Sequence, residues 1–162
     1  MFFGNSDKFA IEIYHEPLEP RWVGFGRMCI HIESHTIGNI NEAHCSLYHA
    51  IDRILDASNS LTNLWDERFL GHSREEIFAL IDAALYTGEP SEMYEEFEKF
   101  DFLTNTGEQF DRWKTFIYCT PDKIVNIPFQ DRDLVVQTPS CSVKEFQSVS
   151  GELARWFIER IK

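Results

Sequence analysis

The sequence predicts an α+β fold in which three helices pack on a mainly antiparallel sheet. Two stretches near the start, Phe9–Tyr14 and Arg27–Glu33, alternate apolar and polar residues, which is the period-two pattern of a half-buried strand. Later stretches place apolar residues three and four positions apart, as an amphipathic helix does. Strand-like and helix-like stretches come in groups, and this grouping favours antiparallel pairing over parallel β-α-β units.

The length and composition predict one domain, residues 1–162. The chain is 43% hydrophobic and contains 14 phenylalanines and four tryptophans, which is too apolar for a disordered protein. A chain of this length can bury a core that is stable without a disulfide or a metal ion. No internal repeat, low-complexity tract or Gly/Ser-rich linker divides the sequence into two units.

The first third of the chain reads as strand, strand, turn and helix. The strand Phe9–Tyr14 is followed by a loop at Pro17–Pro20, which can fold the strand Arg27–Glu33 back on the first one. A turn is expected at His35–Asn39. A helix is expected over Asn41–Ala57, capped by its first residue, because apolar residues recur at helical spacing along it.

The middle of the chain reads as a helix followed by strands. The capping box Ser73-Arg74-Glu75-Glu76 predicts a helix that extends to Tyr86, since the serine and the glutamate can each satisfy the other's backbone N–H. Phe97–Thr104 reads as a strand. Trp113–Cys119 and Lys123–Phe129 read as a hairpin, because the intervening Thr-Pro-Asp has turn chemistry.

A last helix is expected at the C-terminus. Ser142-Val143-Lys144-Glu145 is a second capping box, and the apolar residues that follow it fall on one helical face. Gly151 weakens this helix by up to about 1 kcal/mol. A start as late as Ser148 or Ser150 is therefore an alternative.

The opening motifs resemble a known family. Residues 3–14 run from a turn at Gly4-Asn5 into Phe9-Ala10-Ile11, residues 22–33 form a glycine-led hydrophobic strand, and an Ile37-Gly38 turn follows. These motifs resemble the immunity proteins of bacterial polymorphic toxin and contact-dependent growth inhibition systems, and most closely immunity protein family 42. The chain departs from the family pattern at Ser6-Asp7, where a proline is expected. Weaker similarity continues at Phe110–Lys114 and in the last helix.

The resemblance implies that the chain binds and neutralises one cognate toxin domain by blocking its active site or its substrate-binding surface. Toxins of these systems are commonly nucleases, so it also suggests a nuclease as the target. The formal net charge of −12 fits a partner with a basic surface. It also disfavours direct nucleic-acid binding, because phosphate backbones would repel the protein. Solubility alone is the alternative explanation of this charge.

The segment between residues 89 and 101 is the strongest candidate for a toxin-binding surface. It interleaves carboxylates with aromatic residues, which suits a basic partner because aromatics anchor the centre of an interface and charges its rim. The alternative is a solvated connection whose phenylalanines enter the core. The candidate toxin-binding residues are Glu89, Glu92, Tyr94, Glu95, Glu96 and Glu98, with Asp52 and Asp56 on the first predicted helix.

No enzyme motif is present, and we expect neither catalytic residues nor a cofactor. The sequence contains no Gly-x-Ser-x-Gly, phosphate-binding loop or dinucleotide fingerprint. Cys141 precedes a helix cap but reads as an ordinary loop thiol. Cys45, His49 and Asp52 would share one face of the predicted helix, where the first two could bind zinc. A solvated polar face explains that pattern better, so we expect no metal.

The chain is expected to be cytoplasmic and monomeric when free. It shows no signal-peptide pattern and no apolar run long enough to cross a membrane, so its cysteines are expected to stay reduced and no membrane partner is expected. The alternative function is that of an acidic secretion chaperone that binds an effector segment. Such chaperones usually open with a helix and dimerise, and light scattering would distinguish the two.

Overall fold

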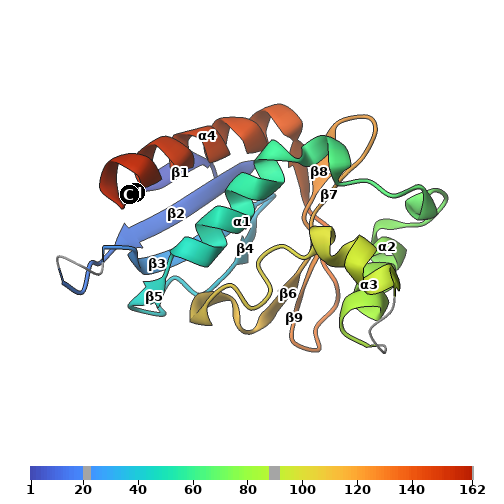
Figure 1. Ribbon diagram of the computed structural model, residues 1–162, viewed down its shortest axis with the longest axis horizontal. Coiled ribbons are helices and arrows are strands. Elements are labelled where there is room, and N and C mark those ends of the chain that lie inside the picture. The colour runs from blue at the N-terminus through green and yellow to red at the C-terminus, as the bar shows by residue number, and fades with distance from the viewer. Residues whose placement is uncertain (20–22, 88–91, 162) are drawn as a thin grey trace.

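The structure is a computed structural model that describes residues 1–19, 23–87 and 92–161 (Figure 1). These residues form four α-helices and three antiparallel sheets, which confirms the predicted α+β class with one helix more than expected. The extra helix is α3 (Glu92–Phe97). Among the described residues, no helix is both long and apolar enough to cross a membrane.

The main sheet is built from the first strands of the chain. Its strands are β1 (Phe2–Asn5), β2 (Phe9–His15), β3 (Phe25–Ile32) and β4 (His35–Ile37), in that order, with the short β5 (Cys45–Ser46) paired to the start of β3. Ile11 pairs with Ile30 and Glu12 pairs with Cys29. Because paired residues of antiparallel strands share a face, one face of the sheet is apolar and the other carries polar side chains.

Two long helices cover the apolar face. α1 (Tyr48–Asn59) and α4 (Val143–Arg160) lie beside each other over β1 and β2 in Figure 1. The rings of Phe9 and Phe146 are 5.0 Å apart between centroids, and both side chains are almost fully buried. α4 begins directly after the cap Ser142, so the alternative start at Ser148 or Ser150 is wrong. The complete capping box and the burial of Phe146 offset the weakening effect of Gly151.

The helix predicted over Asn41–Ala57 begins later than expected. Cys45–Ser46 is extended and pairs with Phe25–Gly26, so α1 starts only at Tyr48, and no side chain caps it. Pairing with β3 satisfies backbone groups that a longer helix would have satisfied internally. The predicted turn at His35–Asn39 is also displaced, because β3 and β4 are joined at Glu33–Ser34, where both residues have positive φ.

The second half of the chain forms two small sheets. β10 (Ser140–Ser142), β8 (Ile124–Asn126) and β7 (Tyr118–Cys119) make one, while β6 (Trp113–Thr115) and β9 (Phe129–Asp131) make the other. The predicted hairpin is confirmed, since β7 pairs with β8 and β6 with β9. The Lys123 N–H donates to the Thr120 carbonyl across the turn at 2.9 Å.

The strand predicted over Phe97–Thr104 is wrong. Phe97 ends α3, and a 3-10 turn follows at Glu98–Phe100. Phe97 and Phe100 are 1% and 0% exposed, so both enter the core. Residues three apart lie on one face of a helical turn but on opposite faces of a strand, which explains the helical conformation. The helix α2 (Arg74–Leu85), with its capping box at Ser73, is confirmed.

Candidate functional site

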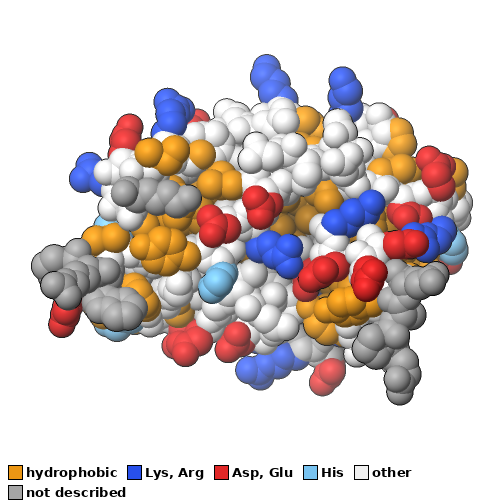
Figure 2. All heavy atoms as spheres, viewed as in Figure 1, with side chains coloured by type: hydrophobic (Ala, Val, Ile, Leu, Met, Phe, Trp, Pro, Cys, Tyr) orange, Lys and Arg blue, Asp and Glu red, His pale blue; other side chains and the backbone are white. Residues whose placement is uncertain are grey.

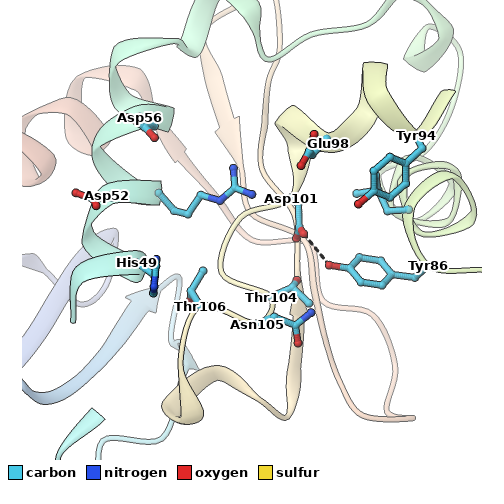
Figure 3. A pocket seen from close by; sticks show the side chains of 12 residues that line it. His49, Asp52, Asp56, Tyr86, Tyr94, Glu98, Asp101, Thr104, Asn105 and Thr106 are labelled. Atoms are coloured by element: carbon cyan, nitrogen blue, oxygen red, sulfur yellow. Dashed lines mark hydrogen bonds between the residues drawn. The ribbon is translucent and has the colours of Figure 1, made fainter. Parts of the chain in front are cut away.

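A cleft of about 600 Å³ opens between α1 and the chain segment that runs from α3 to Thr106 (Figure 3). α1 provides one wall, the end of α2 and α3 with its following turn provide the other, and residues 104–106 lie along a third side. Its lining residues are His49, Asp52, Arg53, Asp56, Leu85, Tyr86, Tyr94, Glu98, Asp101, Thr104, Asn105 and Thr106.

Half of the predicted toxin-binding residues line this cleft, although they come from two distant parts of the sequence. Asp52 and Asp56 come from α1, and Tyr94 and Glu98 face them from α3 and the turn after it. In Figure 3, Asp52 points away from the centre of the cleft, so it belongs to the outer rim. The structure therefore joins the acidic helix face and the acidic aromatic segment into one surface.

Two of the other predicted residues, Glu95 and Glu96, lie outside the cleft. Glu95 is exposed on α3, and Glu96 forms an ion pair with Arg68, which also holds Asp66 at 2.7 Å. Asp66 and Glu96 thus share one positive charge, and the three side chains together keep a net negative charge. Glu89 and the side chain of Glu92 fall outside the described residues.

Asp101 occupies the centre of the cleft and was not predicted as a site residue. Its Oδ2 accepts a 2.6 Å hydrogen bond from the Tyr86 hydroxyl, drawn as a dashed line in Figure 3. Its Oδ1 is buried and has no hydrogen-bond partner among the described residues. The nearby Thr104 hydroxyl donates instead to the Thr115 carbonyl at 3.1 Å. Burial raises the pKa of Asp101, because the charged form loses hydration.

The cleft has an excess of negative charge. Among the described residues, four carboxylates line it, from Asp52, Asp56, Glu98 and Asp101, against the single guanidinium of Arg53. Arg53 acts to lower the pKa of Asp101, but burial outweighs it. Figure 2 shows acidic side chains on both sides of the cleft, over α1 and α3. The site is therefore suited to a positively charged group that brings its own hydrogen-bond donors.

Sequence reasoning missed Tyr86, Asp101 and Arg53 for identifiable reasons. Asp101 is the last residue of the acidic aromatic segment. The strand predicted over Phe97–Thr104 gave no reason to place its carboxylate beside the other candidate residues. Tyr86 is the C-cap of α2, where a tyrosine reads as a boundary residue. Arg53 follows Asp52 on α1, and only the tertiary structure turns this part of α1 toward Asp101.

The zinc pattern considered for Cys45, His49 and Asp52 does not form. Cys45 is buried in β5, where its thiol donates to the carbonyl groups of Glu42 and Ala43 at 3.7 and 3.9 Å. His49 and Asp52 line the cleft instead. Cys141 lies in β10 rather than in a loop, and burial raises its pKa to about 12, which leaves the thiol protonated at neutral pH.

Comparison with known proteins decides the family. The family model for Immunity protein 42 matches residues 1–156. The chain belongs to this family. The similarity inferred from the opening motifs is thereby confirmed and extends over nearly the whole immunity protein, not only over its first strands.

One solved structure shares the fold of this immunity protein. It is the crystal structure of CdiI from Burkholderia dolosa AUO158, which matches with a TM-score of 0.64 and 12% sequence identity. The match covers 96% of this chain and 99% of that chain. At this identity the likeness concerns the fold alone. No curated protein matches the sequence.

Proposed function

We propose that this immunity protein neutralises one cognate toxin domain by binding it stoichiometrically, with the acidic cleft at the centre of the contact. Membership of the Immunity protein 42 family over residues 1–156 is the observation that carries the proposal. This family membership also favours an immunity function over the alternative function of an acidic secretion chaperone. The protein acts by occupying the toxin surface and performs no chemistry of its own.

The unpaired carboxylate oxygen of Asp101 supports the choice of the cleft. A buried acceptor without a donor costs about 1–3 kcal/mol in the free protein, and a partner that supplies a donor recovers this energy. A lysine or arginine side chain of the toxin supplies both the donor and the opposite charge. Asp56 and Glu98, on opposite walls, would flank such a side chain.

The rim of the cleft offers apolar anchors beside the charges. Tyr86 and Tyr94 both line the cleft, and each is 38% exposed. Tyrosine and arginine dominate the energetically important positions of protein interfaces, and surrounding contacts exclude water from them. A basic toxin side chain in the cleft and an aromatic rim around it together form such an arrangement.

The proposed mechanism is occlusion of a basic active site or substrate-binding surface on the toxin. A nuclease is the proposed target, because a pocket that binds phosphates is basic and complements this cleft. The protein is proposed to act in the cytoplasm, as a monomer before it meets the toxin. Size-exclusion chromatography with light scattering tests the monomeric state, and a stable dimer would contradict it.

The decisive experiment expresses the C-terminal part of the product of the gene directly upstream, with and without the immunity protein. Growth arrest that only this chain relieves, together with a one-to-one complex, is the expected result. Failure to relieve the arrest despite good expression would overturn neutralisation for that pair.

A second experiment tests the cleft itself with the double variant Asp56→Lys/Glu98→Lys. Because complementary charge raises association rates by orders of magnitude at low salt, we expect association at least about tenfold slower than wild type. The double variant Asp133→Lys/Glu159→Lys is the matched control, since it makes the same charge change at two exposed residues outside the cleft. Equal association rates for the cleft double variant and wild type would remove the cleft from the interface and leave neutralisation standing.

A further inference from the structure

Three potential metal ligands meet on the polar face of the main sheet, the face that α1 and α4 do not cover. Glu12 Oε2 lies 3.0 Å from His31 Nε2, and the Cys29 Sγ lies 3.4 Å from His31 Nε2 and 3.8 Å from Glu12 Oε2. No side chain of the cleft belongs to this cluster. The proposed toxin contact therefore does not account for it.

The strand register brings the three side chains together. Glu12 on β2 pairs directly with Cys29 on β3, and His31 lies two residues further along β3. Residues two apart on one strand point to the same face, as do residues paired across antiparallel strands. The three ligands thus come from rigid, hydrogen-bonded backbone rather than from loops.

The distances match those of a tetrahedral zinc site. Zinc binds sulfur at about 2.3 Å and nitrogen or carboxylate oxygen at about 2.0–2.1 Å, which at tetrahedral angles separates nitrogen from oxygen by about 3.3 Å and sulfur from either by about 3.5 Å. The observed separations of 3.0, 3.4 and 3.8 Å each lie within about 0.3 Å of these values. Small side-chain rotations are sufficient to bind the ion.

The neighbouring strands orient the histidine for this role. His31 Nδ1 lies 3.1 Å from Thr36 Oγ1 on β4, which leaves Nε2 directed at Cys29 and Glu12. A metal-binding histidine characteristically bonds a polar partner through its other ring nitrogen, and this contact fixes the tautomer and the ring. Phe2 on β1 stacks on the His31 ring with centroids 5.5 Å apart. All four neighbouring strands therefore contribute to the arrangement.

The charges and the exposure also suit a divalent cation. A Cys29 thiolate and the Glu12 carboxylate together balance the two positive charges of the ion, and the neutral His31 ring adds none. Cys29 is fully buried, whereas the Glu12 and His31 side chains are 23% and 20% exposed, which leaves one side open to solvent.

We propose that Glu12, Cys29 and His31 bind one Zn²⁺ ion, with water in the fourth position. The ion replaces the Cys29 thiol proton, which is released to solvent, and it fastens β2 to β3. Zinc uptake by the purified full-length chain tests the proposal without the toxin, so the outcome is separate from that of the proposed neutralisation.

Calorimetric titration with zinc chloride and absorption spectra with Co²⁺ are the two measurements. We expect one ion per chain, a higher Tm with zinc, and a thiolate-to-cobalt charge-transfer band. Cys29→Ser removes the band and lowers zinc affinity more than 100-fold. Thr36→Val, which leaves all three ligands in place, weakens zinc binding about 10- to 100-fold through the orientation of His31.

Cys141→Ser is the matched control, because Cys141 is another buried free thiol outside the cluster. It is expected to keep both the cobalt band and the zinc affinity. The proposal is overturned if the wild-type chain takes up no zinc, or if Cys29→Ser and Cys141→Ser bind it equally. Equal affinity of Thr36→Val and wild type would remove the orienting role of Thr36 and leave the three-ligand site in place.

Discussion

The replacement of Asp101 by asparagine separates stability from binding at the centre of the cleft. In the wild-type chain, the carboxylate is partly buried, one oxygen accepts from Tyr86, and the other has no partner in the described structure. Asparagine keeps an oxygen that accepts from Tyr86 and removes the buried charge. We therefore expect Asp101→Asn to stabilise the free protein while it weakens toxin binding.

The size of both effects follows from this geometry. Asparagine places an amide group where the unpaired oxygen was, so the gain comes from removal of the buried charge alone, and a gain of about 1 kcal/mol raises the Tm of a chain of this length by about 2–4 °C. Loss of one partner from a buried, hydrogen-bonded charge pair costs about 2–5 kcal/mol of binding, which is at least about 30-fold in Kd.

Tyr86→Phe provides the opposite perturbation of the same hydrogen bond. It removes the hydroxyl group that donates to Asp101 Oδ2, so neither carboxylate oxygen then has a donor in the described structure. Loss of a hydrogen bond to a charged group costs about 1.5–3 kcal/mol. Thermal and urea unfolding of the two variants beside wild type is the assay. If Asp101→Asn lowers the unfolding free energy as much as Tyr86→Phe does, the buried charge of Asp101 does not destabilise the free protein and the reasoning fails.

The pH dependence has a defined sign. The folded-state pKa of Asp101 is raised, so its contribution to stability is fully present below the unfolded pKa and is lost as the pH rises through the folded pKa. The stability advantage of Asp101→Asn should therefore be largest near pH 7 and shrink as the pH is lowered. An advantage that does not change with pH would exclude the carboxylate charge as its cause.

Three further predictions concern other parts of the chain. Charge reversal of Glu92, Glu95 and Glu96 together slows toxin association in low salt, and unchanged rates would remove α3 from the interface. Phe100→Ala, at a fully buried position, lowers the unfolding free energy by about 3–5 kcal/mol in urea titrations, and a loss below about 1 kcal/mol would contradict its core role. Gly151→Ala stabilises α4 by about 0.4–1 kcal/mol, because the added methyl group meets no atom within 4 Å; a lower Tm would refute this.

The site could be predicted only in part from the sequence. Acidity and interleaved aromatics selected Tyr94 and Glu98, and helical spacing selected Asp52 and Asp56, so four residues of the cleft were identified as two separate surfaces. Asp101, the residue at the centre, was missed because its conformation was assigned to a strand. Composition reports which side chains are available, but it does not report which of them face one another.

The features that depend on near neighbours follow from local patterns in the amino-acid sequence. Alternation predicted β2 and β3, and the capping boxes at Ser73 and Ser142 predicted the starts of α2 and α4, because a serine and a glutamate three residues apart satisfy each other's backbone N–H. The opening strands were also sufficient to identify the family that the whole-chain match confirms.

The features that depend on distant partners are set when the chain folds. α1 begins at Tyr48 because Cys45–Ser46 pairs with Phe25–Gly26, a contact that no local pattern encodes. The cleft and the Glu12–Cys29–His31 cluster likewise depend on register and on the packing of remote elements. The physical reason is that capping and periodicity act within a few residues, whereas strand pairing and burial act between segments that meet only when the chain folds.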